Sequence, residues 1–338
     1  MRRSVLARVL TLAALFAAVG CGGYRTVERR LPAGPGWPAD QPRVRLDSIV
    51  ELDGKSGSGS SRFLRWLGEE DSATLRRFRR PYGVTWMGEQ VIVADPDARR
   101  VARIAPRGRI AFSNDGLFRR PVGVAACLGG LVVSDAESGR VALLDAELEL
   151  VRWLARDLER PTGIACAGQV VHVVETGRHR LLALDGEGGT KAIGGRGAEP
   201  GRFNFPTALA VDGAELLVGD TLNFRVQRIE RFTGTFLDAF GRLGDAPGEM
   251  PRIKSVAVDR AGQVWVSDAH LDRVSLYDRE GQLLVSIGRS GSGVGEFSFP
   301  AGIAAHADGR VAVVDSLNRR LQIFRVAGET PSPTGAMR

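Results

Sequence analysis

The chain has 338 residues, 43% of them hydrophobic and 25% charged, which is the composition of a globular protein with one large domain or two average ones. A mean hydropathy of -0.07 and 7% aromatic residues exclude a largely disordered chain and a protein with several membrane spans. Although the pI is about 10, removing residues 1–20 leaves 43 basic against 39 acidic residues, a net charge of +4 that excludes an extended nucleic-acid-binding surface. The 43 glycines indicate many turns and therefore β-structure.

Residues 1–20 have the layout of a secretion signal. A basic start is followed by an apolar run from Leu10 to Val19 that is too short to span a bilayer. The small residues before Cys21 resemble the lipobox of bacterial lipoproteins, although Ala18 departs from the larger aliphatic residue usual there, and ordinary secretion is the alternative. The resemblance implies a lipid on Cys21 that anchors the chain in the bacterial cell envelope. The glycines that follow Cys21, in place of an aspartate, imply the outer membrane.

The segments that flank the body are expected to differ in order. Residues 21–42 are rich in Pro, Gly and Arg and have no apolar period, so we expect a flexible tether. Residues 43–52 have the composition of a strand. A Gly/Ser loop at 53–61 and a short helix at 62–68 are expected to follow, and residues 329–338 are expected to be a disordered tail.

One motif recurs six times from about residue 80. Each copy opens with an aromatic or basic residue, a proline and a glycine, with Ala208, Ser255 and Ile253 as departures in the fourth and fifth copies. Fourteen or fifteen residues later an apolar strand ends in an acid, and an arginine stands five residues after each acid. The pairs are Asp95 and Arg100, Asp135 and Arg140, Glu175 and Arg180, Asp220 and Arg225, Asp268 and Arg273, and Asp315 and Arg320.

This spacing predicts an all-β fold, a six-bladed β-propeller over residues 43–328. A period of 40–50 residues with four short strands is typical of propeller blades. The first copy predicts strands at 83–86, 90–94, 101–105 and 109–112, named a to d. Outer d strands are predicted at 148–154, 190–193, 236–240 and 282–287, so the sixth copy lacks one. We expect residues 43–52 to supply it, which closes the ring and covers an open sheet edge.

Two stretches carry a family resemblance. Asp315 to Phe324 (DSLNRRLQIF) and Asp220 to Gln227 (DTLNFRVQ) resemble the NHL repeat, in six copies over residues 81–326, the first three more divergent. The resemblance implies an NHL/TolB-like six-bladed propeller. Similar propellers include envelope lipoproteins, sensor domains, the RNA- and protein-binding domains of tripartite-motif proteins and a peptide-amidating lyase, so the family predicts the fold better than the function.

The b–c turns and the d–a connections of such blades share one face, called here the b–c face. The recurrent acid and arginine bracket each b–c turn, and we interpret them as structural ion pairs. The positions two and four residues after the acid vary, and we assign them to partner binding, with a solvated face as the alternative. The predicted partner-binding residues are Asp97, Arg99, Glu137, His179, Phe224, His270, Asp272 and Arg319. Three long d–a loops, at 195–204, 241–250 and 288–298, lie on the same face.

A metal-dependent lyase or hydrolase with its site at the central channel is the alternative function. The resemblance to the amidating lyase implies zinc held by histidines, but the four histidines do not converge: His172 lies within a core strand, His306 on the opposite face, and His179 and His270 in blades that are not neighbours. Three of them cannot meet at metal-ligand distances of about 2 Å. We therefore predict no catalytic residue, no metal and no cofactor.

Two further stretches have open interpretations. Cys127 and Cys166 end neighbouring a strands at different offsets from their prolines, which favours buried free thiols over a disulfide. The basic, aromatic stretch at 75–80 fits acidic lipid headgroups or an acidic protein surface, or a solvated face. The sequence thus predicts a monomeric, membrane-anchored, non-catalytic scaffold that binds a protein, peptide or glycan through the b–c face, and no nucleic acid.

Overall fold

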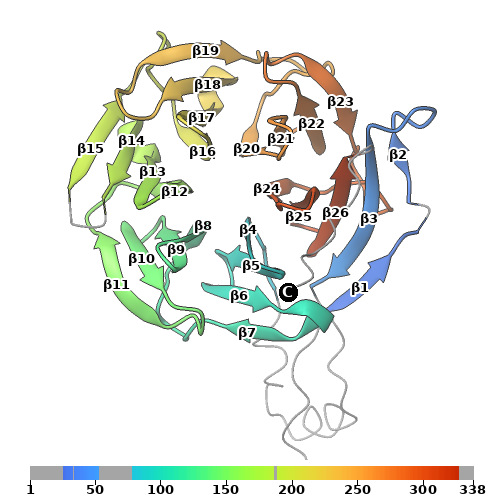
Figure 1. Cartoon of the computed structure of the whole chain (residues 1–338), viewed down its shortest axis with the longest axis horizontal. Helices are drawn as coiled ribbons and strands as arrows, with labels where there is room; N and C mark the ends of the chain where they lie inside the picture. The colour runs from blue at the N-terminus through green and yellow to red at the C-terminus, as the bar shows by residue number, and fades with distance from the viewer. Residues whose placement is uncertain (1–25, 33, 53–77, 186–188, 327–338) are drawn as a thin grey trace, which may run out of the picture.

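The computed structural model describes residues 26–32, 34–52, 78–185 and 189–326. These residues form six antiparallel sheets arranged as blades around a central channel, so the prediction of an all-β, six-bladed propeller is confirmed (Figure 1). Cys21, the signal segment, the loop and helix expected at 53–68 and the tail at 329–338 lie outside the described residues. Within them, no helix is both long and apolar enough to cross a membrane.

The first three blades each contain four strands in chain order. Blade one has β4 (Gly83–Met87), β5 (Gln90–Asp95), β6 (Arg100–Ile104) and β7 (Ile110–Phe112); blade two has β8 (Pro121–Cys127), β9 (Gly130–Asp135), β10 (Arg140–Leu144) and β11 (Leu150–Ala155); blade three has β12 (Pro161–Ala167), β13 (Val170–Glu175), β14 (Arg180–Leu184) and β15 (Thr190–Gly194). The four strands predicted in blade one are confirmed, with ends within one or two residues.

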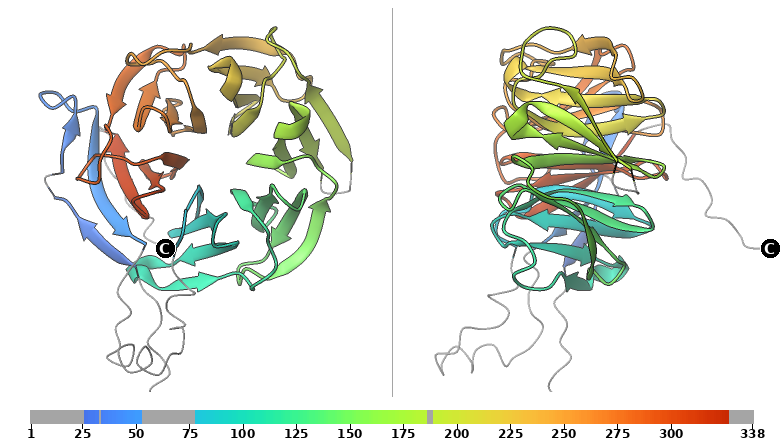
Figure 2. Two further views of the ribbon diagram at one scale, coloured as in Figure 1. Left: turned by 180° about the vertical axis from the view of Figure 1, so that it is seen from behind. Right: turned by 90° about the vertical axis from the view of Figure 1, so that its left-hand side faces the viewer.

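The last three blades follow the same order. Blade four has β16 (Pro206–Asp212), β17 (Glu215–Asp220), β18 (Arg225–Glu230) and β19 (Phe236–Phe240); blade five has β20 (Ile253–Val258), β21 (Val264–Asp268), β22 (Arg273–Tyr277) and β23 (Leu283–Ile287); blade six has β24 (Pro300–Ala305), β25 (Arg310–Asp315) and β26 (Arg320–Val326). Viewed from the side, the blades form a short cylinder (Figure 2). Strand a is the innermost strand of each blade (Figure 1).

Blade six is completed by the N-terminal strand β3 (Val44–Glu51), which confirms the predicted closure of the ring. β3 pairs antiparallel with β26, from Val44 opposite Val326 to Glu51 opposite Arg320. Its inward residues Val44, Leu46 and Ile49 are buried in the cluster that also holds Trp265 and Phe324. Figure 1 shows β3, in blue, beside β26, in red. Closure therefore covers the edge of β26 and buries apolar surface at the same time.

The expectation of a flexible tether over residues 21–42 is wrong for residues 27–30 and 36–37, which form strands. β1 (Val27–Arg30) and β2 (Gly36–Trp37) both pair with the outer edge of β3. The ring of Trp37 also packs against Phe324, with centroids 5.9 Å apart. The physical reason is that β3 exposes a row of unpaired backbone groups, and a segment can satisfy them through its own main chain whatever its side chains.

The hydrophobic core lies between neighbouring blades. The b strands are covered on both faces, and all six residues of β9 are buried, which explains why they read as continuous apolar runs in the sequence. Each cluster draws side chains from two adjacent sheets; one joins Ile92 of blade one to Val133 and Leu144 of blade two. The blades thus form a rigid ring that holds the loops at both ends of the channel.

Cys127 and Cys166 form a disulfide, so the expectation of two free thiols is wrong. Their Cα atoms are 5.9 Å apart, which lies within the range of disulfides. The pleat alternates side-chain direction within one sheet, but β8 and β12 belong to different sheets. Their offsets from the two prolines therefore do not fix how the two side chains are oriented toward each other. The bond joins blades two and three at the end of the channel opposite the b–c face.

Candidate functional site

The recurrent acid at the end of each b strand is buried and holds the backbone that enters strand a. Asp95 accepts hydrogen bonds from the backbone N–H of Arg79 (2.6 Å) and of Arg80 (3.0 Å). The acids of the other blades do the same for the residue one or two positions before their own a strand: Asp135 for Arg119 and Arg120, Glu175 for Glu159, Asp220 for Asn204, Asp268 for Arg252 and Asp315 for Ser298. The contacts of these acids therefore extend beyond the b–c turn to the backbone that enters strand a.

The recurrent arginine has three kinds of partner. The predicted ion pair is present between Glu175 and Arg180 (2.6 Å), Asp220 and Arg225 (3.0 Å), and Asp315 and Arg320 (2.7 Å). In the first two blades the guanidinium lies over an aromatic ring, Arg100 over Phe112 and Arg140 over Trp153, and in blade five Arg273 donates to a backbone carbonyl of a d–a loop. Arg320 also donates to three carbonyls of the d–a loop at 288–298, so these arginines fasten the loops of the b–c face.

The fourth position after each acid has a left-handed backbone in every blade. The residues are Arg99, Gly139, His179, Phe224, Asp272 and Arg319, with φ between 47° and 67°. Only glycine adopts this conformation without steric cost, yet five of the six positions hold a residue other than glycine. The shape of the turn therefore constrains this position, which was assigned to partner binding from the sequence.

The predicted partner-binding residues divide into two groups. Asp97, Arg99, Glu137, His270 and Arg319 are exposed on the b–c face.

The other three face inward. Nδ1 of the buried His179 accepts the N–H of Phe205 (3.1 Å), and the two rings are in contact. Asp272 accepts the N–H of Phe299 (2.7 Å) and the hydroxyl of Ser290. Phe224 is half-buried. His179 and Asp272 thus hold the entry to the next blade and are removed from the partner-binding set.

The sequence analysis missed a ring of arginines at the mouth of the channel. The residue that precedes each a-strand opening comes to lie around the axis on the b–c face. In chain order these residues are Arg80, Arg120, Arg160, Phe205, Arg252 and Phe299. All four arginines line one cavity of about 620 Å³, together with Lys254, Tyr82, Phe299 and Glu137. The signal was present as the basic or aromatic residue that opens each repeat, but only ring closure brings its copies together.

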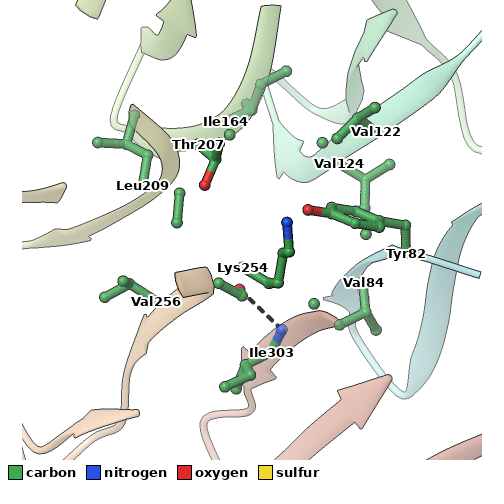
Figure 3. A pocket seen from close by; sticks show the side chains of 16 residues that line it. Tyr82, Val84, Val122, Val124, Ile164, Thr207, Leu209, Lys254, Val256 and Ile303 are labelled. Carbon is green, nitrogen blue, oxygen red and sulfur yellow. Dashed lines mark hydrogen bonds between the residues drawn. The ribbon is translucent and has the colours of Figure 1, made fainter. Parts of the chain in front are cut away.

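Below this mouth the channel is nearly closed by apolar side chains. The third residue after each opening contributes one, and the six come from all six a strands: Val84, Val124, Ile164, Leu209, Val256 and Ile303. Each is only 4% to 7% exposed, and the space that they share is about 70 Å³. Figure 3 shows them around the channel, with Lys254 and Tyr82 pointing into the same space. The mouth is therefore a cup with a charged rim and an apolar floor.

The positive charges act on one another across the cup. Burial lowers the pKa of Lys254 to about 8; the charges of Arg252, Arg160 and Arg80 add to the decrease, and the carboxylate of Asp268 opposes it. Burial raises the pKa of Tyr82 to about 12, and all four arginines oppose that increase. Two cations also lie over the ring of Phe299, Arg80 at 4.6 Å and Lys254 at 5.4 Å. The cup thus has a positive potential that would favour an anion.

Neither end of the channel suits a metal ion. Glu137 is the one carboxylate among the residues that line the cup, so the donor set there does not fit a cation. At the opposite end, ligand atoms of Glu89, His306 and Asp308 lie within 4.8 Å of one another. Arg310 donates to both carboxylates at 2.7 Å and lies over the ring of Trp86, so a guanidinium already neutralises this cluster.

The remaining histidine, His172, is buried in β13 as predicted. Neither of its ring nitrogens has a hydrogen-bond partner among the described residues. Burial lowers its pKa to about 4, so the ring is neutral at physiological pH. It lies far from the cup and offers nothing to a site there.

Comparison with known proteins supports the fold. No protein-family model matches the chain. It is 31% identical over 153 residues, 40% of its length, to the E3 ubiquitin-protein ligase TRIM32 of Mus musculus, and 28% identical over 131 residues, 38% of its length, to the protein brain tumor of Drosophila melanogaster. Both are NHL-repeat proteins. The chain spans 21% and 12% of the length of these two relatives, so the match is partial.

The similar solved structures are propellers that include enzymes. A gluconolactonase from Xanthomonas campestris matches with a TM-score of 0.60 and 16% identity over 89% of this chain and 99% of that one. A virginiamycin B lyase from Staphylococcus aureus, in complex with quinupristin, matches with a TM-score of 0.55 and 11% identity over the same shares of the two chains. At these identities the likeness establishes the six-bladed β-propeller fold alone.

Proposed function

We propose that this chain is a non-catalytic scaffold, anchored by a lipid on Cys21 to the outer membrane of a bacterial envelope, that binds a protein, peptide or glycan through the b–c face. The observation that carries the proposal is a set of exposed apolar side chains on that face. Leu222 and Leu317, 45% and 54% exposed, lie in the b–c turns of blades four and six. Leu243 and Val294, 60% and 41% exposed, lie in the d–a loops beside them.

These side chains project from rigid loops. The 288–298 loop is held by Arg320 and by Gln322, whose Nε2 donates to the carbonyl of Glu296 (2.7 Å). The 241–250 loop, which carries Leu243, is held by Tyr277, whose hydroxyl donates to the carbonyl of Gly248 (3.0 Å). Preorganised loops lose little entropy on binding, which favours recognition of a partner by this face.

The disulfide between Cys127 and Cys166 supports the envelope location, because disulfides persist in oxidising compartments. The anchor is tested by labelling cells with radioactive palmitate. We expect label on the wild-type chain and none on the Cys21→Ser variant. Equal labelling of both, or label on neither, would contradict the anchor.

The binding face is tested by a photo-crosslinking amino acid placed at Leu222 or Leu317 in intact cells. We expect the same adduct from both positions. Phe232 and Leu237, which are as exposed but lie at the rim of blade four, serve as matched controls and should give no adduct. Adducts of equal yield at all four positions would contradict the proposal that the partner binds through the b–c face.

The catalytic alternative is tested by metal analysis of the purified chain. The scaffold predicts less than a tenth of an equivalent of zinc or other divalent cation, and no change in thermal stability with a chelator. A stoichiometric bound metal would favour a lyase or hydrolase.

A further inference from the structure

The cup at the channel mouth holds more positive charge than the protein neutralises. Among the described residues, no acidic side chain lies within 4.0 Å of the cationic groups of Arg80, Arg160, Arg252 or Lys254, whereas Arg120 is 3.8 Å from Asp97. Glu137 is the one carboxylate in the lining. Like charges that face one another in a concave site raise the free energy of the folded chain, so their presence needs a reason other than stability.

The fold fixes the backbone of three of the four rim arginines, and of the four only Arg120 has an ion-pair partner among the described residues, Asp97 at 3.8 Å. The buried carboxylates of Asp95, Asp135 and Asp268 accept the backbone N–H of Arg80, Arg120 and Arg252. Each of these three side chains therefore starts from a fixed backbone position and lines the cup. A ligand that bound there would meet donors that are already oriented, which reduces the entropic cost of binding.

The size and chemistry of the cup define a class of ligand. Its volume of about 620 Å³ lies within the range of small-molecule sites, roughly 300–1,000 Å³. Guanidinium groups donate paired hydrogen bonds to the oxygens of a carboxylate or phosphate. Lys254 and Tyr82 lie at the base of the cup, and the apolar ring beneath them prevents a ligand from passing deeper (Figure 3).

We propose that the cup binds a compact ligand carrying two or more oxyanion groups, carboxylate or phosphate, held by the arginines at the rim and by Lys254 at the base. This site goes beyond the proposed function: it lies at the centre of the b–c face, but it can bind its ligand whether or not the surrounding turns bind a macromolecule. Its failure and that of the partner-binding face are therefore observed in separate experiments.

The test is calorimetric titration of the purified mature chain with citrate, pyrophosphate and acetate at low ionic strength. We expect at least one of the two polyanions to bind at least tenfold more tightly than acetate. Tighter binding of citrate identifies a polycarboxylate as the natural class, and tighter binding of pyrophosphate identifies a phosphate ester. If neither polyanion binds better than acetate, the proposal is wrong.

A pair of charge-matched variants locates the site. The variant Arg160→Gln/Arg252→Gln/Lys254→Met should bind the preferred polyanion at least tenfold more weakly than the wild type. The control Arg107→Gln/Arg109→Gln/Lys191→Met removes the same three charges from exposed positions at the outer edge of blades one and three, and it should bind within twofold of the wild type. Equal weakening in both variants would mean that only net charge matters, which overturns the proposal.

A pH titration tests the role of Lys254 with a single substitution. As the pH rises from 7.5 to 9.5, Lys254 loses its proton, so the affinity of the wild type should fall relative to that of the Lys254→Met variant at each pH. This ratio removes the titration of the ligand itself. A ratio that stays constant over the range would contradict the assignment of Lys254 to the site.

Discussion

The two ends of the channel are built from the same six repeats and treat charge in opposite ways. One end, opposite the b–c face and separated from the cup by the apolar ring, is called here the closed end. There Arg310 bridges Glu89 of blade one and Asp308 of blade six, and the Cys127–Cys166 disulfide joins two further blades. At the open end, arginines from four blades and Lys254 face one cavity with few acidic partners. From this difference we infer that the closed end contributes stability, and that the open end retains unpaired charge for the ligand proposed above.

Among the changes that compare the two ends, removal of the disulfide should have the largest effect on stability. We expect the variant Cys127→Ser/Cys166→Ser to lose about 3 kcal/mol of unfolding free energy, because it releases a closed loop of nearly 40 residues in the unfolded chain. Denaturant unfolding of the oxidised wild type and the variant measures the loss. Affinity for the polyanion should stay within twofold, and a larger change would show that the two ends are coupled.

Removing one arginine from each end sharpens the contrast. Arg310→Gln should cost about 1–2 kcal/mol, since it leaves Glu89 and Asp308 without their shared donor. Arg160→Gln, the matched change at the mouth, should alter stability by less than about 0.5 kcal/mol, because Arg160 is exposed and has no ion-pair partner among the described residues. Thermal unfolding of both variants compares them directly. Equal losses of stability would contradict the difference drawn between the two ends.

The smallest expected effect is a gain in stability rather than a loss. Lys254→Met should stabilise the chain by on the order of 1 kcal/mol at pH 7, after allowance for solvent screening of this partly exposed group. The folded pKa of about 8 lies below the unfolded value of 10.5, so the penalty for the charge is complete below pH 8 and disappears as the pH rises through 10.5. The gain should follow that course in unfolding measured at pH 7, 9 and 10.5. A loss of stability at pH 7 would mean that Lys254 has a structural role.

Most of the fold could be predicted because the same sequence pattern recurs in all six blades. The acid at the end of each b strand and the arginine five residues later recur without exception, and the missing sixth outer strand predicts the place of β3. The pairing of β1 and β2 could not be predicted in this way. It depends on backbone groups along the outer edge of β3, and the residues of β1 and β2 carry no apolar pattern.

The site was harder to predict because it exists only in the closed ring. Arg80 and Arg252 are 172 positions apart in the chain, and neither is distinctive in its own repeat. The variable positions of the b–c turns were the more obvious candidates, yet His179 and Asp272 proved to hold the backbone of the following blade. The variable residues of the turns were predicted to be functional, whereas the residue just before the opening of strand a carries the charge in four of the six blades.

The most direct test of the account is a crystal structure of the chain with a heavy oxyanion such as tungstate, located by its anomalous scattering. The account predicts a peak on the channel axis among Arg80, Arg160, Arg252 and Lys254, above the apolar ring, and none in the Arg310 cluster. A peak at the closed end, or scattered peaks on outer arginines with the cup empty, would contradict it.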